Sequence, residues 1–187
     1  MKQHLLRHKL LTALTMLLCL NFAQAQTPSA SFTANQTNGC SPFNVLFTNT
    51  STGAVSYYWD FGNGNTSTQI SPSNIYSLPG SYTVTLIATS GTGINDTVIS
   101  NNLIYVDANP VADFVATQTA GCTNTIFSFV NNSVNAVSWL WDFGDGNTSV
   151  LQNPTHSYIN AGVYTVQLIV TSAGGCTDIF IRNNYIQ

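Results

Sequence analysis

Basic residues are scarce in this 187-residue chain, and three of its four Lys and Arg residues fall within the first nine positions. Lys2, Arg7 and Lys9 precede an apolar run, so Arg182 is the single basic residue in the rest of the sequence. Binding to nucleic acid or to an anionic membrane surface depends on clusters of Lys and Arg. The composition therefore excludes nucleic acid as a partner and an electrostatic contact with a membrane.

The first 25 residues have the three parts of a secretory signal peptide. The basic start is followed by the apolar run Leu10–Leu20 and by the small-x-small site Ala23-Gln24-Ala25. The run is too short to span a bilayer, and Leu18 before Cys19 argues against a lipoprotein anchor. We expect cleavage after Ala25, which leaves a secreted or cell-surface chain without a membrane-inserted segment.

Side chains suited to catalysis are also scarce. Beyond Ala25 the chain has no Glu, no Lys and one His, and its seven acidic residues are all Asp, so the net charge is 1 − 7 = −6. Nucleophilic or acid–base catalysis needs a base and an orienting group near the reacting atoms. His156 has no His counterpart in the repeat described next, where Asn74 corresponds to it. We therefore predict that the chain is not an enzyme.

A nine-residue phrase occurs twice, as WDFGNGNTS from Trp59 and as WDFGDGNTS from Trp141. Shifting the chain by 82 residues aligns Ser29–Tyr105 with Val111–Gln187 without a gap, and 37 of the 77 positions are identical. Similarity over such a span indicates tandem domains, each with its own core. We predict domains at residues 29–107 and 111–187, called the first copy and the second copy below.

Period-two patterns dominate each copy. Tyr82, Val84, Leu86 and Ala88 alternate with Thr and Ile, and the second copy repeats the pattern from Tyr164. Alternation of this kind is typical of a half-buried strand, and turn residues at short intervals separate several such segments. Each copy is therefore predicted to be an all-β sandwich.

The order of these motifs resembles the polycystic kidney disease (PKD) domain family. The run W-D-F-G-[DN]-G is followed in each copy by a Pro, a Tyr, a Gly and Y-T-V-x-L, and the likeness covers nearly all of the chain beyond residue 25. The resemblance implies an immunoglobulin-like sandwich used extracellularly for adhesion, for spacing or beside a hydrolase domain. The Asn- and Thr-rich copies also look similar to those of secreted Bacteroidetes proteins.

The repeated motif residues have structural roles in this interpretation. The tryptophans point into the core between two sheets, and the glycines supply positive φ in a tight turn. Asp60 and Asp142 accept backbone N–H groups across that turn, while the tyrosines resemble a tyrosine corner. The residues with these predicted roles are Trp59, Asp60, Gly62, Gly64 and Tyr82, and Trp141, Asp142, Gly144, Gly146 and Tyr164.

No cofactor is expected, but calcium is an alternative for the repeated turn. Carboxylate and amide oxygens of Asp60, Asn63, Asp142 and Asp145 are hard ligands of the kind that Ca²⁺ takes. The spacing is not that of an EF-hand, and the turn accounts for the same residues.

The cysteines suggest one disulfide. Cys122 and Cys176 both lie in the second copy, 54 residues apart, and disulfides persist in secreted chains. Cys40 corresponds to Cys122, but Ile94 stands where Cys176 stands. We predict a Cys122–Cys176 bridge and leave Cys40 as a free thiol or an intermolecular link.

The sequence favours a non-catalytic role in binding, adhesion and spacing. The expected partner is an extracellular protein or polysaccharide surface. Two alternatives stay open: an accessory region of a secreted hydrolase, and a carbohydrate-binding module with Tyr58 on its outer face. The short linker Val106–Pro110 predicts semi-rigid domains. The second copy stops two residues short of the first copy's last strand, so we expect a fragment that more domains or a sorting segment follow.

Overall fold

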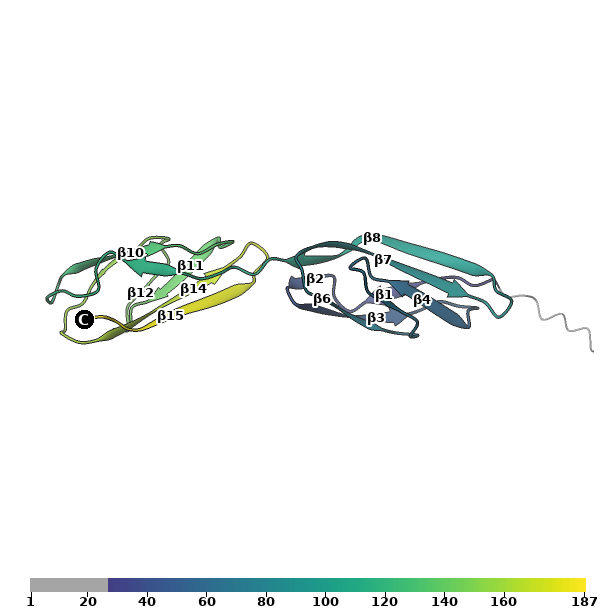
Figure 1. The fold of residues 1–187 in the computed structure, drawn as a ribbon, viewed down its shortest axis with the longest axis horizontal. Helices are drawn as coiled ribbons and strands as arrows, with labels where there is room; N and C mark the ends of the chain where they lie inside the picture. Colours follow the sequence, from purple (N-terminus) through teal and green to yellow (C-terminus); the bar gives the residue numbers. More distant parts are fainter. Residues whose placement is uncertain (1–26) are drawn as a thin grey trace, which may run out of the picture.

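The computed structural model describes residues 27–187, so the expected signal peptide lies outside the described residues. These residues form two all-β copies arranged end to end (Figure 1), and the C-terminus lies at the far end of the second copy. The strands of the first copy are β1 (Phe32–Ala34), β2 (Asn38–Cys40), β3 (Phe43–Asn49), β4 (Ser56–Asp60), β5 (Thr66–Ser67), β6 (Ser73–Tyr76), β7 (Gly80–Thr89) and β8 (Asn95–Asp107). Those of the second are β9 (Phe114–Ala116), β10 (Ile126–Asn131), β11 (Ser138–Asp142), β12 (Thr148–Ser149), β13 (Thr155–Ser157), β14 (Tyr164–Thr171) and β15 (Thr177–Ile186).

Each copy is a two-layer sandwich. The first copy pairs a sheet of order β1-β3-β6 with a sheet of order β2-β8-β7-β4-β5, and the second pairs β13-β10-β9 with β12-β11-β14-β15. The pairs are antiparallel except for β2, which runs parallel to the end of β8. The prediction of two tandem all-β sandwiches is therefore confirmed.

Alternating burial explains why these segments form strands. In β3 the residues Phe43, Val45 and Phe47 are buried while their neighbours along the chain are exposed. Side chains two apart share one face of a strand, so this face covers the core while the other faces solvent. Val84 and Leu86 on β7 cover the core from the opposite sheet, and their neighbours along that strand are partly buried.

One tryptophan lies at the centre of each core. The side chains of Trp59 and Trp141 are both fully buried, and each indole N–H donates to a backbone carbonyl, of Gln69 and of Leu151, at 2.9 Å in both copies. The hydrogen bond removes the cost of burying the polar end of the ring. The predicted core position of both tryptophans is confirmed.

The predicted tyrosine corners are present in both copies. The Tyr82 hydroxyl donates to the carbonyl of Leu78 at 2.6 Å, and the Tyr164 hydroxyl donates to the carbonyl of Asn160 at 2.7 Å. In both cases the acceptor lies four residues upstream, so the hydrogen bond holds the loop before the strand against the strand's own tyrosine.

The repeated turn depends on two glycines with different surroundings. Gly144 and Gly146 have φ values of 82° and 91°, in the region that favours glycine. A Cβ on Gly144 would collide with the carbonyl oxygen of Thr165, whereas a Cβ on Gly146 would meet nothing within 4 Å. Gly62 and Gly64 repeat both features in the first copy.

This difference gives a matched pair of substitutions. Gly146→Ala puts a residue with a side chain into the left-handed backbone region but creates no clash. We expect it to lower the free energy of unfolding by about 1–2 kcal/mol. Gly144→Ala adds a backbone clash to the same strain, so its loss of unfolding free energy should be clearly larger. Urea unfolding followed by tryptophan fluorescence measures both, and equal losses would contradict the close approach to Thr165.

Candidate functional site

The carboxylates of the repeated turn hold its backbone in place. Asp60 accepts the N–H of Gly62 at 2.9 Å, and Asp142 accepts the N–H of Gly144 at 2.8 Å. These bonds join residues two apart, as in an Asx-turn. The structural role predicted for both residues from the sequence is confirmed.

The second copy has an acidic group where the first has an amide. Asp145 corresponds to Asn63, and its carboxylate accepts from the backbone N–H and side-chain amide of Asn147 at 3.1 and 3.0 Å. Its Oδ2 also lies 2.8 Å from Nε2 of His156. The His156 ring stacks on Phe143 with centroids 4.2 Å apart, which fixes it over the turn.

In the first copy a hydrogen bond between two amides takes the place of this His–Asp hydrogen bond. The side chain of Asn65 donates to the Oδ1 atom of Asn74 at 2.8 Å, and Asn74 corresponds to His156. The two copies therefore tie the turn to the neighbouring strand with different chemistry. His156 therefore acts as a structural residue, through its hydrogen bond to Asp145 and its stacking on Phe143.

Hydrogen bonding decides the acidity of the Asp145 carboxyl. Burial alone would raise its pKa, but the hydrogen bonds from Asn147 and His156 outweigh burial and hold the pKa below its ordinary value. Burial raises the pKa of Tyr76 to about 12 and raises that of Tyr158 further. Both tyrosines stay neutral at physiological pH, as core residues do.

The calcium candidates lie in these turns with part of their oxygen atoms already engaged. Asp60, Asp142 and Asp145 accept the bonds given above, and Oδ1 of Asn63 accepts the N–H of Asn65 at 3.2 Å. Within residues 27–187 no group of three or more His, Cys, Asp or Glu side chains is arranged to hold a metal ion.

The outer face of the larger sheet carries exposed apolar side chains. Tyr58 and its counterpart Leu140 are each 44% exposed. Tyr58 lies opposite Ile87, which lies opposite Thr97, so the tyrosine has no aromatic neighbour along that row of the sheet.

The cysteines join the two copies to each other. A disulfide links Cys40 of the first copy to Cys176 of the second, with Cα atoms 5.7 Å apart and a sequence separation of 136. Cys122 is free and exposed. The predicted Cys122–Cys176 bridge and the predicted free Cys40 are both wrong.

The physical reason is the direction of the last strand. Cys176 precedes the first residue of β15, whereas Cys122 follows Gly121, whose N–H donates to the carbonyl of Gln187 beyond the last residue of that strand. Ten residues of strand span roughly 30 Å, but a disulfide needs Cα atoms within about 7 Å. The two cysteines of the second copy therefore lie at opposite ends of it.

Other contacts accompany the disulfide where the copies meet. The amide of Asn109 donates to the carbonyl of Ser41 at 2.6 Å, and Pro110 is buried. Gly174, in the turn between β14 and β15, lies so close to Asp107 that a Cβ there would collide with the carboxyl group. Cys40, Asp107, Gly174 and Cys176 define what we call the interdomain joint.

The comparison with known families follows from this architecture. The PKD domain family model matches the chain twice, at residues 25–104 and 107–184. Together the two matches cover most of the sequence.

The chain belongs to the PKD domain family.

Relatives share single stretches of the PKD region. A microbial collagenase of Vibrio alginolyticus is 56% identical over 41 residues, which is 22% of this chain and 5% of that protein. The pre-pro-metalloprotease PrtV of Vibrio cholerae is 54% identical over 44 residues, 24% of this chain and 5% of that protein. The chain therefore matches only about one twentieth of the length of these proteins.

Two solved PKD domains are also similar. The PKD1 domain of Vibrio anguillarum Epp is 34% identical, with a TM-score of 0.39, and the match covers 45% of this chain and all of that one. The PKD1 domain of PrtV is 41% identical, with a TM-score of 0.38, and covers 43% of this chain and 98% of that one. The likeness to Bacteroidetes proteins stays a prediction.

PKD domains are non-catalytic modules, and this chain consists of two of them beyond its first residues. Its described part, residues 27–187, includes no helix of the length and apolarity that crossing a membrane requires.

The Asp145 carboxylate should make the second PKD domain sensitive to acid. Because its pKa is lowered on folding, its contribution to stability is present above the unfolded pKa of about 3.9 and is lost as pH falls through the lower folded value. Asp145→Asn should therefore lower the melting temperature at pH 7 by a few degrees and should lower it by clearly less at about pH 2. An equal decrease at both pH values would contradict the assignment.

Thiol mapping tests the interdomain joint directly. Alkylation of the unfolded, unreduced chain from Gln26 onward should modify Cys122 alone, and proteolysis should release the Cys40 and Cys176 peptides as one cross-linked species. Cys122→Ser should leave no reactive thiol. Modification of Cys40, or a Cys122–Cys176 peptide pair, would refute the connectivity.

Proposed function

We propose that the chain is a stiff spacer and contact module of a secreted or cell-surface protein. The observation that supports the proposal is the Cys40–Cys176 disulfide, which fixes one PKD domain to the next. Disulfides persist in oxidising compartments outside the cytoplasm, so the same bond supports an extracellular location. Contact with an extracellular protein or polysaccharide surface is part of this proposal.

The joint supplies a stiffness that the linker alone lacks. The three residues between Asp107, at the end of β8, and Val111 would allow the domains to change direction if they were flexible, since the end-to-end distance of such a linker is about 10 Å. Here the linker is fastened at Asn109 and Pro110, and the disulfide adds a second covalent connection beside it. Two connections at different points on the interface oppose both bending and twisting.

The accessory region of a secreted hydrolase is the second candidate. It is favoured by the matches to collagenases and to a metalloprotease, in which the shared stretch is a small part of the protein. In that setting the two PKD domains would hold a catalytic domain at a defined distance from a surface. The stiffness argued above serves this role as well.

Small-angle X-ray scattering tests the spacer proposal. In a Cys122→Ser background, which prevents covalent dimers, the oxidised chain should scatter as one elongated rigid particle. Replacing Cys40 and Cys176 by serine should broaden the distribution of distances between the domains, and reduction of the parent protein should do the same. Identical scattering with and without the disulfide would contradict the proposal.

A further inference from the structure

The free cysteine occupies the same position in its domain as a bonded cysteine does in the other. Cys122 corresponds to Cys40 in the repeat, and a glycine precedes each of them. Cys40 is bonded to the following domain, whereas Cys122 is exposed and free. The question is whether the second domain presents Cys122 in the same way.

Backbone hydrogen bonds show that the segments before the two cysteines begin alike, although Cys40 ends β2 while Cys122 begins a turn in which its carbonyl accepts the N–H of Thr125. In the first domain the N–H of Tyr105 donates to the carbonyl of Thr37 at 2.8 Å, and in the second the N–H of Gln187 donates to the carbonyl of Thr119 at 2.8 Å. These four residues correspond pairwise across the repeat. The segment that leads to the cysteine therefore begins to pair with the end of the last strand in the same register in both domains.

The turn that receives a cysteine bond is distinguishable by its sequence. The turns 90–94 and 172–176 have the same backbone: Ser90 and Ser172 donate to the carbonyls of Ile94 and Cys176, both at 2.8 Å. Thr92 of the first domain corresponds to Gly174 of the second, and Ile94 corresponds to Cys176. Gly174 and Cys176, the residues of the second copy at these two positions, both contact the first domain.

Each of the two differences has a physical reason. Gly174 leaves room for Asp107 of the preceding domain, since a Cβ would collide with its carboxyl group. Cys176 supplies the thiol that bonds to Cys40. The turn 172–176 is therefore built to dock on a preceding PKD domain, while the turn 90–94 lacks both features.

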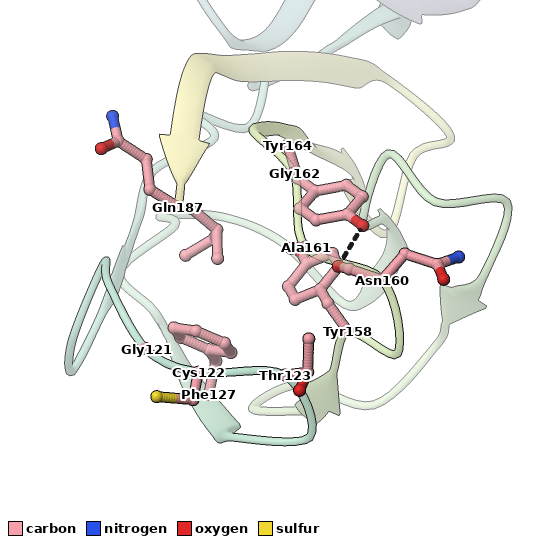
Figure 2. A pocket seen from close by; sticks show the side chains of 11 residues that line it. Gly121, Cys122, Thr123, Phe127, Tyr158, Asn160, Ala161, Gly162, Tyr164 and Gln187 are labelled. Atoms are coloured by element: carbon pink, nitrogen blue, oxygen red, sulfur yellow. Dashed lines mark hydrogen bonds between the residues drawn. The ribbon is translucent and has the colours of Figure 1, made fainter.

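The far end of the second domain is also open where the first is filled. A recess of about 250 Å³ lies there, lined by residues that include Cys122, Phe127, Tyr158, Tyr164 and Ile186. Figure 2 shows the recess between Gln187, at the end of β15, and the two tyrosines, with Cys122 at its margin.

In the first domain two apolar side chains close this end. Phe43, which corresponds to Thr125, lies against Gly39, and Val106 pairs with Gly80; both are buried. Val106 belongs to the stretch that continues into the linker and the second domain. In the first domain Phe43 and Val106 therefore occupy the place that corresponds to the recess beside Cys122.

We infer that Cys122 is the covalent attachment site for a further PKD domain, whose turn between its last two strands carries Gly and Cys where Gly174 and Cys176 lie here. The incoming domain resembles the second copy, because the turn 172–176 has a thiol at Cys176. The turn 90–94 of the first copy has Ile94 there and offers no thiol. A chain of such domains would then be linked head to tail by one disulfide at every joint. The inference does not depend on the stiffness of the chain.

The bond forms by oxidation of two thiols. The Cys122 thiolate attacks a disulfide-bearing oxidant such as oxidised glutathione and releases one reduced thiol. The thiolate of the incoming turn then attacks the resulting mixed disulfide at the Cys122 sulfur and releases the second. Two protons and two electrons leave the cysteines, and the oxidant receives them as two thiols.

A three-domain chain tests the inference. Residues 106–187 are appended after Gln187, which reproduces the linker, the 82-residue period and the 136-residue separation found between Cys40 and Cys176. After refolding with oxidised glutathione, peptide mapping should find Cys40 bonded to Cys176 and Cys122 bonded to the turn cysteine of the added domain. One reactive thiol should remain, in the added domain's equivalent of Cys122.

The first copy provides a matched control. Appending residues 106–110 followed by residues 29–105 adds a domain with Thr and Ile in its turn, so Cys122 and the added equivalent of Cys40 should both stay reactive. A cooperative unfolding transition for each added domain shows that it is folded. Alkylation of Cys122 in the folded test protein, its pairing with any other cysteine, or a covalent dimer through it would overturn the inference.

Discussion

Each domain is organised around one indole ring that solvent does not reach. Trp59 and Trp141 bridge the two sheets of their sandwiches, each with a phenylalanine stacked beside it, Phe61 and Phe143, at centroid distances of 6.2 and 6.5 Å. Burial of a large aromatic side chain is a dominant favourable term in a domain of this size. The turn that follows the tryptophan, the strand that pairs with it and the sheet opposite all take their positions from it.

The domain itself could be predicted from the sequence because its determinants are local and repeated. Alternation fixed the inward face of β7, and the glycines and Asp60 identified the turn without any long-range information. The tyrosine corner is equally local, since its hydrogen bond spans four residues. What a short segment determines by its own sterics and hydrogen bonding can be inferred from that segment.

The joint could not be predicted in the same way, because it depends on how domains follow one another. Pairing Cys122 with Cys176 assumed that a disulfide belongs within one domain, whereas the direction of β15 puts these residues at opposite ends. One signal was present in the sequence. The first copy has Ile94 where the second has Cys176, so its turn cannot form a disulfide. The free cysteine, Cys122, lies in the second copy. Both facts fit a bond from each domain to the turn of the next one.

The disulfide also determines which parts of the chain carry mechanical load. When the chain is pulled from both ends, tension passes from the segment before Cys40 through the sulfur atoms to the segment after Cys176. The 136-residue separation between these cysteines corresponds to roughly 450 Å of extended chain. That length stays outside the path of the force, so the pair of domains can lose its fold under tension and still lengthen only by its two short outer segments.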